Sequence, residues 1–382
     1  MSSICRYVRL EFVQLPERGS GFACETLPAH LYVDLVSNYR QCQLKRRKCM
    51  SHHTFKAMVV TETEDHQFVR EIKDRNLDTL PAGDVLVKVS YSSLNYKDVL
   101  SAIGNRGVTR QYPHTPGIDA AGTVIESLSP DFKPGDAVIV TSYDLGMNTS
   151  GGFGQYIRVP AEWVVHMPGG LSARESMIFG TAGFTAALSV YRLVDYGINP
   201  DQGRILVSGA TGGVGSIAVS ILVKSGYEVV AVNGVVDEKE FLLEIGAKEV
   251  ISIEEATDTS GKPLLKGLWA GGIDTVGGDI LATIIKSTKD GGGVTCCGNV
   301  GSHDLPLNVY PFILRGVTLM GIDSQNCPMP LREKTWQKIA MDWKLERLEL
   351  LTTEVPLEGL NERIDLILAK KHKGRTIVQL PD

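Results

Sequence analysis

The sequence predicts an α/β protein in which a mostly β region is joined to a doubly wound parallel sheet. From Phe55 to about Pro168 the chain consists of short β-rich runs separated by Gly and Pro turns. From Ser172 onward, strand-like and helix-like segments alternate at the period of βαβ units, which is typical of a parallel sheet. The chain has 382 residues, enough for two domains with a core each.

The β-rich region begins with the run FKAMVV at Phe55, which has the composition of a first strand. Further strands are expected at residues 85–90, 122–126, 137–140 and 155–159. The turn Lys133–Asp136 contains Pro and Gly, which set the dihedral angles that a tight turn requires. This region is therefore expected to be mostly β.

The later region alternates between the two kinds of element. Strands are expected at residues 204–208, 227–232, 272–276, 293–297 and 317–322, and helices at 216–224, 238–245 and 332–345. Gly246 ends the second of these helices. A last strand at 376–380 closes the domain.

The strongest motif is the glycine-rich turn that follows the strand ending at Ser208. Glycines stand at 209, 212, 213 and 215, and a helix starts at once. Such glycines let the backbone approach a pyrophosphate, whose charge is held by the N–H groups at the helix start. Because the motif lies between the strand and the helix that it requires, it predicts a dinucleotide-binding Rossmann domain rather than a tight turn without a ligand.

The end of the second strand of this unit bears on the choice of cofactor. NAD-binding sites usually carry an acid about 20 residues past the glycines. Here the sequence after Val232 is Asn-Gly-Val-Val, and the first acid is Asp237. A 2′-phosphate would meet no repulsion at this place, so the sequence favours NADPH, with NADH as the alternative.

Composition and charge argue against several classes of partner. The net charge of −5 disfavours nucleic acid, and no apolar run reaches the length of a membrane span. The seven cysteines have no zinc-like spacing, and in a chain of this length they suggest a reducing compartment. We therefore expect a cytoplasmic protein without nucleic-acid or membrane partners.

Residues 1–49 differ from the rest of the chain. They hold eight Lys and Arg against four Asp and Glu, as well as four of the seven cysteines. They lack the apolar core of a signal peptide, and four acids are unusual in a transit peptide. We interpret them as an extraneous or disordered segment upstream of the fold. A targeting peptide, or a nuclear signal at residues 45–48, is the alternative.

From Phe55 to Leu380 the chain resembles the acryloyl-CoA reductase and YhdH/YhfP-type quinone oxidoreductase branch of the zinc-independent medium-chain dehydrogenase/reductase superfamily. The resemblance rests on SSLNYKD at 92–98, PGIDAAGTV at 116–124, GTAGFTAA at 180–187, SGATGGVGS at 208–216, IDTVGG at 273–278, PFILRGVTLMGIDS at 311–324 and KGRT at 373–376. It implies a GroES-like catalytic domain, residues 50–172 and 308–382. A Rossmann domain, residues 173–307, would face it across the active-site cleft.

The resemblance also allows a zinc site to be tested. Zinc members of the superfamily carry Cys in the loop that here reads Asn95–Asp98. They have Gly-His-Glu where this chain has Gly117-Ile118-Asp119. Neither a thiolate nor an imidazole is available at these places, so hydride transfer without a metal ion is expected.

The resemblance implies the site residues as well. Asn95 and Tyr96 would lie beside the nicotinamide as catalytic candidates, with Tyr96 either donating a proton or covering the ring. Asp98 is either a helix cap or a participant. The implied cofactor-binding residues are Tyr96, Thr181, Thr211, Gly212, Gly213, Val214, Asn233, Gly234, Val235, Gly298, Asn299, Phe312, Ile313, Ser324 and Arg375.

Two departures from the family concern the 2′-phosphate. Relatives usually have a basic residue where this chain has Val235, and Arg where it has Ile253. Losing both should weaken the preference for NADPH.

The expected reaction is hydride transfer to the β-carbon of an α,β-unsaturated carbonyl, with a short 2-enoyl-CoA such as acryloyl-CoA as substrate. A quinone or enone oxidoreductase, or a cofactor-binding protein of low turnover, is the alternative. Arg106 and Arg110 are candidates for the CoA phosphates. The apolar strand at residues 317–322 lies at the end of the Rossmann order, where the family joins two sheets across a two-fold axis, so a homodimer is expected.

Overall fold

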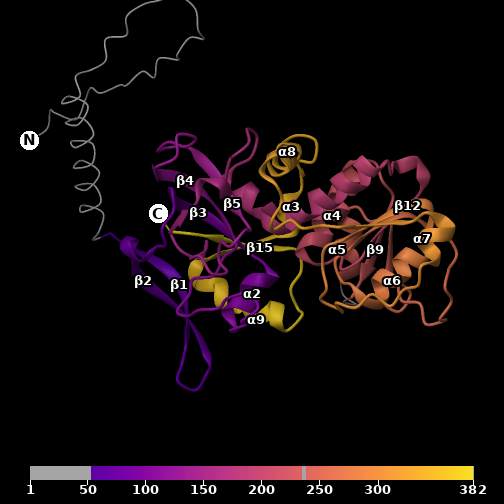
Figure 1. The fold of residues 1–382 in the computed structure, drawn as a ribbon, viewed down its shortest axis with the longest axis horizontal. Helices are drawn as coiled ribbons and strands as arrows, with labels where there is room; N and C mark the ends of the chain where they lie inside the picture. Colours follow the sequence, from indigo (N-terminus) through magenta and orange to yellow (C-terminus); the bar gives the residue numbers. More distant parts are fainter. Residues whose placement is uncertain (1–52, 235–237, 382) are drawn as a thin grey trace, which may run out of the picture. The chain divides into compact units, whose positions relative to one another are not determined.

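The structure is a computed structural model that describes residues 53–234 and 238–381 (Figure 1). The N-terminal segment 1–49, with our interpretation of it, lies outside the described residues, and so does Val235. The described strands form two large sheets and one hairpin.

The first large sheet has seven strands and is mixed. Its order is β14-β15-β3-β4-β5-β7, with β6 pairing with β3. Its strands are β3 (Val85–Leu94), β4 (Asp119–Ser127), β5 (Ala137–Thr141), β6 (Tyr156–Val159), β7 (Val164–His166), β14 (Thr352–Pro356) and β15 (Arg375–Gln379). Helices α2 (Tyr96–Ala102) and α9 (Leu360–Leu368) contact each other beside it. All of the strands expected in the β-rich region are present.

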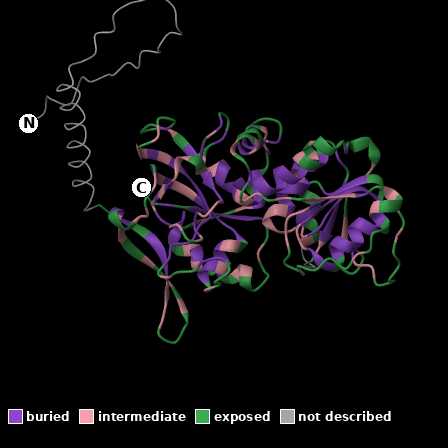
Figure 2. Ribbon diagram, in the orientation of Figure 1, coloured by how far each residue is buried: buried purple, intermediate pink, exposed green. Residues whose placement is uncertain are grey.

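The hairpin consists of β1 (Thr54–Glu62) and β2 (Phe68–Asn76). Figure 2 shows that the strands of the large sheets are mostly buried, whereas the turn of this hairpin is exposed. The β1 strand agrees with the expectation from FKAMVV, but β2 was not expected, because its charged sequence lacks an apolar pattern.

The second large sheet has six parallel strands in the order β10-β9-β8-β11-β12-β13. These strands are β8 (Ile205–Val207), β9 (Val229–Asn233), β10 (Glu249–Ser252), β11 (Trp269–Asp274), β12 (Thr288–Cys296) and β13 (Thr318–Gly321). Helices α4 (Gly213–Lys224), α5 (Lys239–Glu244), α6 (Gly278–Lys286) and α7 (Tyr310–Arg315) lie between them in sequence. Counted along the chain this is the order 3-2-1-4-5-6, so the expected Rossmann sheet is confirmed.

One expected domain boundary does not match the sheet. We expected residues from 308 onward to belong to the GroES-like domain, but β13 pairs with β12 as the last strand of the parallel sheet. The helix α8 (Met329–Ala340) follows β13, and the chain returns to the first sheet only at β14. The reason is that the apolar strand β13 gains a ladder of parallel hydrogen bonds on β12.

Helix α3 (Ala173–Tyr196) contacts elements of both large sheets (Figure 1). It starts with a capping box between Ser172 and Glu175 and ends at Gly197 in the left-handed conformation. Among the described helices, α3 alone is long and apolar enough to cross a membrane, but 78% of its apolar window is buried inside the protein. That burial is what a core helix requires.

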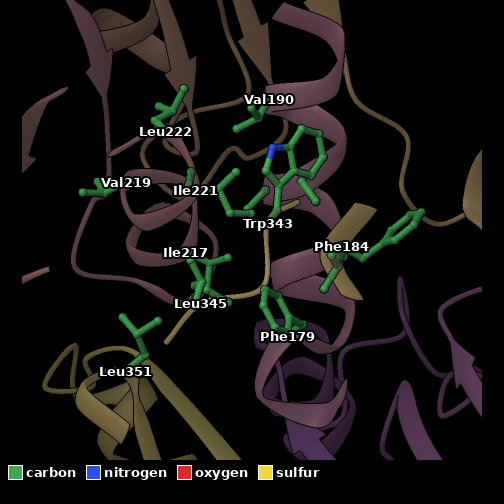
Figure 3. Packing of buried hydrophobic residues seen from close by; sticks show 14 of the residues in the cluster. Phe179, Phe184, Val190, Ile217, Val219, Ile221, Leu222, Trp343, Leu345 and Leu351 are labelled. Atoms are coloured by element: carbon green, nitrogen blue, oxygen red, sulfur yellow. The ribbon is translucent and has the colours of Figure 1, made fainter. Parts of the chain in front are cut away.

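The core around α3 is shown in Figure 3. Phe179, Phe184 and Val190 of α3 pack with residues of α4, including Ile217 and Leu222. Trp343, Leu345 and Leu351, from the segment that follows α8, belong to the same cluster. This cluster packs α3 against α4, the helix that begins at the glycine-rich turn.

Candidate active site

The glycine-rich turn between β8 and α4 has the geometry that a pyrophosphate requires. Gly209 has a φ of +56°, which favours glycine, and a Cβ on Gly215 would overlap the carbonyl of Gly209. Gly212 caps α4 without a side-chain hydrogen bond, so the first N–H groups of the 12-residue helix are not covered by a cap. The turn lies at the end of β8 next to β11, where the strand order reverses and such sheets bind ligands.

The central feature of the site is the buried carboxylate of Asp119, at the start of β4. Its Oδ2 accepts hydrogen bonds from Ser93 Oγ at 2.5 Å, Asn95 Nδ2 at 2.7 Å and the Thr181 N–H at 2.8 Å. Its Oδ1 accepts one from Thr181 Oγ1 at 2.6 Å. A single carboxylate thus orients two of the expected site residues, Asn95 and Thr181.

Arg375, at the start of β15, completes this cluster from the other end of the chain. Its Nη2 lies 3.9 Å from Asp119 Oδ2 and donates to Ser93 Oγ at 2.8 Å. Its Nη1 donates to Asn95 Oδ1 at 3.2 Å, and its Nε to the carbonyl of Ile178 at 2.9 Å. Burial lowers the pKa of Arg375, while the Asp119 carboxylate acts to raise it. Arg375 is therefore an internal cross-link and not a solvated surface charge.

Arg375 also reaches the glycine-rich turn. A Cβ on Gly213 would lie 3.0 Å from Arg375 Nη1, so the guanidinium passes directly beside the first turn of α4. The neighbouring Gly374 N–H donates to the Thr211 carbonyl at 2.9 Å. The structure thereby brings Asn95, Thr181, Arg375 and the glycine-rich turn together.

Asn95 and Tyr96 have different surroundings. Asn95 is buried and held by Asp119 and Arg375, which fix the orientation of its amide. Tyr96 begins α2, and 51% of its surface is exposed. Tyr96 is therefore accessible to a bound molecule, whereas Asn95 presents a fixed dipole.

Asp98 acts as a cap in this structure. Its carboxylate accepts hydrogen bonds from the N–H groups of Asn95 at 2.8 Å, Ile118 at 2.8 Å and Gly117 at 3.1 Å. Burial, and then the nearby Asp119 carboxylate, raise the pKa of Asp98 to about 7. Asp98 thus holds the loop of Asn95 against the start of β4.

A second layer of contacts extends from Thr181. Ser142 Oγ lies 2.9 Å from Thr181 Oγ1, and Ser142 and Tyr143 both have positive φ values, 65° and 50°. Two consecutive non-glycine residues in the left-handed backbone conformation indicate local strain beside the site. Thr185, one turn further along α3, donates to the Thr181 carbonyl at 2.7 Å, and its Oγ1 accepts from Ser324 Oγ at 2.8 Å. These bonds attach the expected residue Ser324 to the same helix as Thr181.

Arg332 of α8 holds the segment that carries Ser324. The side chain is fully buried, and Nη2 donates to the carbonyls of Ser324 at 3.0 Å and Gln325 at 3.1 Å. Its Nη1 donates to the Thr141 carbonyl at 3.0 Å. Gln325 in turn accepts a hydrogen bond from Lys97, beside Tyr96. Arg332 was not expected as a site residue, because nothing in its helical sequence marks it.

The adenosine side of the expected site lies after β9. Asn233 ends β9 opposite Ser252 of β10, and a Cβ on Gly234 would lie 3.2 Å from Ile253 Cδ1. Ile253 therefore lies against Gly234, one of the residues that the resemblance predicts to face the adenosine ribose. Val235 lies outside the described residues.

The remaining expected residues are not joined to the cluster of Asp119. Gly298 and Asn299 follow β12, where a Cβ on Gly298 would overlap the backbone of Thr275. Phe312 packs with the core cluster of the Rossmann sheet, while 70% of Ile313 is exposed. Of the two arginines considered for CoA phosphates, Arg106 pairs with Glu62.

The described residues contain no group of three or more His, Cys, Asp or Glu side chains that could share a metal ion. The residues that reasoning from sequence missed are Asp119, Ser93, Ser142 and Arg332. Asp119 carried a usable signal, since it stands where zinc members of the superfamily have Glu. Its hydrogen-bond partners could not be foreseen, because they come from three separate segments.

Two family models match the chain. The model described as "Alcohol dehydrogenase GroES-like domain" matches residues 81–169, and the one described as "Zinc-binding dehydrogenase" matches residues 213–345. Among curated proteins, the putative quinone oxidoreductase YhfP of Bacillus subtilis is 46% identical over 85% of this chain and 99% of its own length. The acrylyl-CoA reductase AcuI of Ruegeria pomeroyi is 42% identical over 85% of this chain and 99% of its own length.

Solved structures agree with these matches. The YhdH oxidoreductase of Salmonella enterica, in complex with NADP, has a TM-score of 0.83 and 41% identity, and the match covers 85% of this chain and 100% of that one. The YhfP protein of Bacillus subtilis, with NAD bound, has a TM-score of 0.84 and 45% identity, covering 86% of this chain and 100% of that one.

Proposed function

Since this chain belongs to the acryloyl-CoA reductase and YhdH/YhfP-type quinone oxidoreductase branch of the medium-chain dehydrogenase/reductase superfamily, we propose that it is a nicotinamide-dependent reductase of C=C bonds. It transfers a hydride to the β-carbon of an α,β-unsaturated carbonyl compound. NADPH is the preferred hydride source, with NADH as a second one. The substrate that we favour is a short 2-enoyl-CoA such as acryloyl-CoA.

One observation carries this proposal. Asp119 links Asn95, Thr181 and Arg375 in a single buried cluster, and Arg375 passes beside Gly213 at the start of α4. The loop of SSLNYKD, the GTAGFTAA helix and the KGRT strand therefore converge on the glycine-rich turn. A site assembled in this way supports catalysis on a bound dinucleotide rather than binding alone.

A dinucleotide fits the residues that are present. The uncapped start of α4 suits a pyrophosphate, and the residues that would hold it are Thr211, Gly212, Gly213 and Val214. The bound nicotinamide supplies the hydride. Asn95, with its amide fixed by Asp119 and Arg375, offers a preorganised dipole near the reacting groups. Tyr96, which is exposed, carries a hydroxyl that can deliver the proton to the α-carbon.

A quinone is the second candidate substrate. Its support is that the relative with 46% identity is named a putative quinone oxidoreductase. Both substrates are conjugated carbonyl compounds, so the same arrangement of Asn95 and Tyr96 would serve either one. The two candidates differ in the CoA moiety, for which Arg110 remains our proposed phosphate contact.

The test compares the two substrates directly. Stopped-flow loss of the absorbance of NADPH should be faster with acryloyl-CoA than with a quinone at equal concentration, and a chelator should leave the rate unchanged. A faster reaction with the quinone would assign the second function. Absence of turnover with both, despite binding of NADPH, would leave a cofactor-binding protein and contradict the proposal.

We also propose that this enzyme acts in the cytoplasm as a homodimer. The cysteines among the described residues, Cys296, Cys297 and Cys327, are free thiols, in agreement with a reducing compartment.

A further inference from the structure

Lys373 and Glu238 meet beside the loop that follows β9. Lys373 Nζ lies 3.1 Å from Glu238 Oε2, and 56% of the lysine side chain is exposed against 20% of the glutamate side chain. The ammonium group also lies 5.6 Å from the centre of the Phe241 ring. Phe241 is buried in α5, so the lysine is held at this place by both a charge and a ring.

Both residues border the part of a Rossmann domain that receives the adenosine ribose. Glu238 directly precedes α5 and follows Asn233, the last residue of β9, by five positions in the sequence. Lys373 precedes Gly374, whose N–H donates to the Thr211 carbonyl in the glycine-rich turn. Lys373 therefore stands between the pyrophosphate-binding turn and the ribose-facing loop.

We propose that Lys373 and Glu238 together read the 2′ position of the adenosine ribose. Lys373 binds the 2′-phosphate of NADPH through a charge-assisted contact. Glu238 accepts a hydrogen bond from the 2′-hydroxyl of NADH, the role of the acid that usually follows the second strand. The only partner that the described residues offer Glu238 Oε2 is the Lys373 ammonium, so this carboxylate oxygen keeps a lone pair that can accept a hydrogen bond from that hydroxyl.

The pair accounts for how this chain can bind a 2′-phosphate without the usual basic side chains. Ile253 supplies no charge, and it lies against Gly234 in the same region. Lys373 supplies the missing charge from the C-terminal end of the chain. Glu238 partly neutralises it, so the preference for NADPH over NADH is predicted to be small. The inference rests on the proposed function only in requiring a nicotinamide dinucleotide.

The experiment measures binding rather than turnover. Calorimetry on the full-length chain compares adenosine 2′,5′-bisphosphate with 5′-AMP, two ligands that differ only in the 2′-phosphate. Lys373→Met keeps the aliphatic stem on Phe241 and removes the charge. Because the lysine side chain is half exposed and screened by solvent, the Lys373→Met change should weaken binding of the bisphosphate by about tenfold. The affinity for 5′-AMP should change by less than about twofold.

Glu238→Gln tests the other half of the pair. Removing the negative charge of Glu238 should tighten binding of the bisphosphate by about threefold, because the charge of Lys373 is then no longer neutralised. The same variant should bind NADH less tightly relative to NADPH, because the carboxylate that accepts from the 2′-hydroxyl is gone. Lys371→Met is the matched control, since Lys371 is an exposed lysine of the same tract, and it should change neither ligand by more than about twofold.

Equal weakening of both ligands by Lys373→Met, or no change in either, would overturn the inference. An effect of Lys371→Met as large as that of Lys373→Met would do so too, because it would indicate a diffuse charge effect. If the predicted discrimination is observed but no conjugated carbonyl compound is reduced, this inference stands and the proposed function fails.

Discussion

At the scale of single residues, the site depends on buried charged groups that are paired and hydrogen-bonded. Asp119 is fully buried and accepts four hydrogen bonds, and Arg375 beside it donates to Ser93, Leu94, Asn95 and Ile178. Removing both ions from water is costly, so each depends on the bonds that the other groups supply. Loss of one partner should therefore affect both the fold and the site.

Asp119→Asn tests this dependence. The new side-chain amide would place its NH₂ group against the Thr181 N–H and Asn95 Nδ2, which are donors and need an acceptor. It would also leave the positive charge of Arg375 without a buried carboxylate beside it. We expect the free energy of unfolding to fall by about 3 kcal/mol and kcat/KM to fall by about a hundredfold. Urea denaturation and steady-state kinetics measure the two effects. Asp290→Asn, at an exposed carboxylate, should change neither, and an active, stable Asp119→Asn protein would refute the role assigned to Asp119.

His372 gives a prediction for pH. Burial, and then the charges of Arg363 and Arg375, lower the pKa of His372 to about 4. The neutral ring therefore contributes stability that is present above the unfolded pKa of about 6.5 and is lost as the pH falls towards 4. Relative to His372→Gln, the wild type should lose about 2 kcal/mol of unfolding free energy between pH 7.5 and pH 5. Parallel stability curves for the two proteins would contradict the prediction.

Ile253 and Val235 give a prediction for cofactor choice. Ile253 lies against Gly234, which precedes Val235 in the sequence, and we propose that both positions face the adenosine ribose. The changes Val235→Lys and Ile253→Arg should tighten NADPH by about 1–3 kcal/mol, the scale of hydrogen bonds to charged groups, and leave NADH nearly unchanged. The ratio of kcat/KM for the two cofactors is the measurement. A wild type with a strong preference for NADPH that the changes do not increase would contradict both the role given to these two positions and the small preference predicted from Lys373 and Glu238.

At the scale of elements, the kink of α3 decides where the site forms. Gly180 has φ 51° and ψ −157°, a conformation open to glycine, about two turns into an otherwise regular helix. The interruption turns the Thr181 N–H towards Asp119 and leaves the Ile178 carbonyl to Arg375. A continuous helix would have kept both groups in its own hydrogen bonds.

Gly180→Ala should destroy this arrangement. A Cβ there would overlap Ser93 Oγ and Asp119 Oδ2, in a backbone conformation that alanine rarely adopts. We expect a loss of about 3 kcal/mol in unfolding free energy together with loss of activity. Gly169→Ala is the control, because a Cβ on Gly169 meets no atom within 4 Å. Thermal denaturation of both variants measures the difference, and equal melting temperatures would contradict the role of the kink.

At the scale of the whole molecule, the edge of the Rossmann sheet points to assembly. Strand β13 is the last strand of this sheet, and α7 directly before it exposes Tyr310, Ile313 and Leu314. An apolar surface beside an unpaired edge strand is typical of an interface. We predict a homodimer formed through this edge.

Light scattering at micromolar concentration should give the mass of two chains, and Leu314→Glu should lower it towards one. Leu314 is chosen because it is not among the proposed cofactor contacts. Leu128→Glu, at an exposed leucine in the other large sheet region, should leave the mass unchanged. A monomeric wild type would refute the prediction.

The sequence alone determined the features that depend on neighbouring residues. The alternation of strands and helices, the order of the elements and the glycine-rich turn after β8 follow from hydrophobic periodicity and from the conformational freedom of glycine. The resemblance in SSLNYKD and KGRT also points to Asn95 and Arg375 as site residues.

Tertiary structure alone decided which of these residues meet. The contacts of Asp119 with Thr181 and Arg375, and of Lys373 with Glu238, join segments that are far apart along the chain. No local pattern encodes such contacts, because they arise from the packing of α3 between two sheets and from the return of the chain to β15. The domain boundary was set in the same way, because β13 pairs with β12 and the chain returns to the first sheet only at β14.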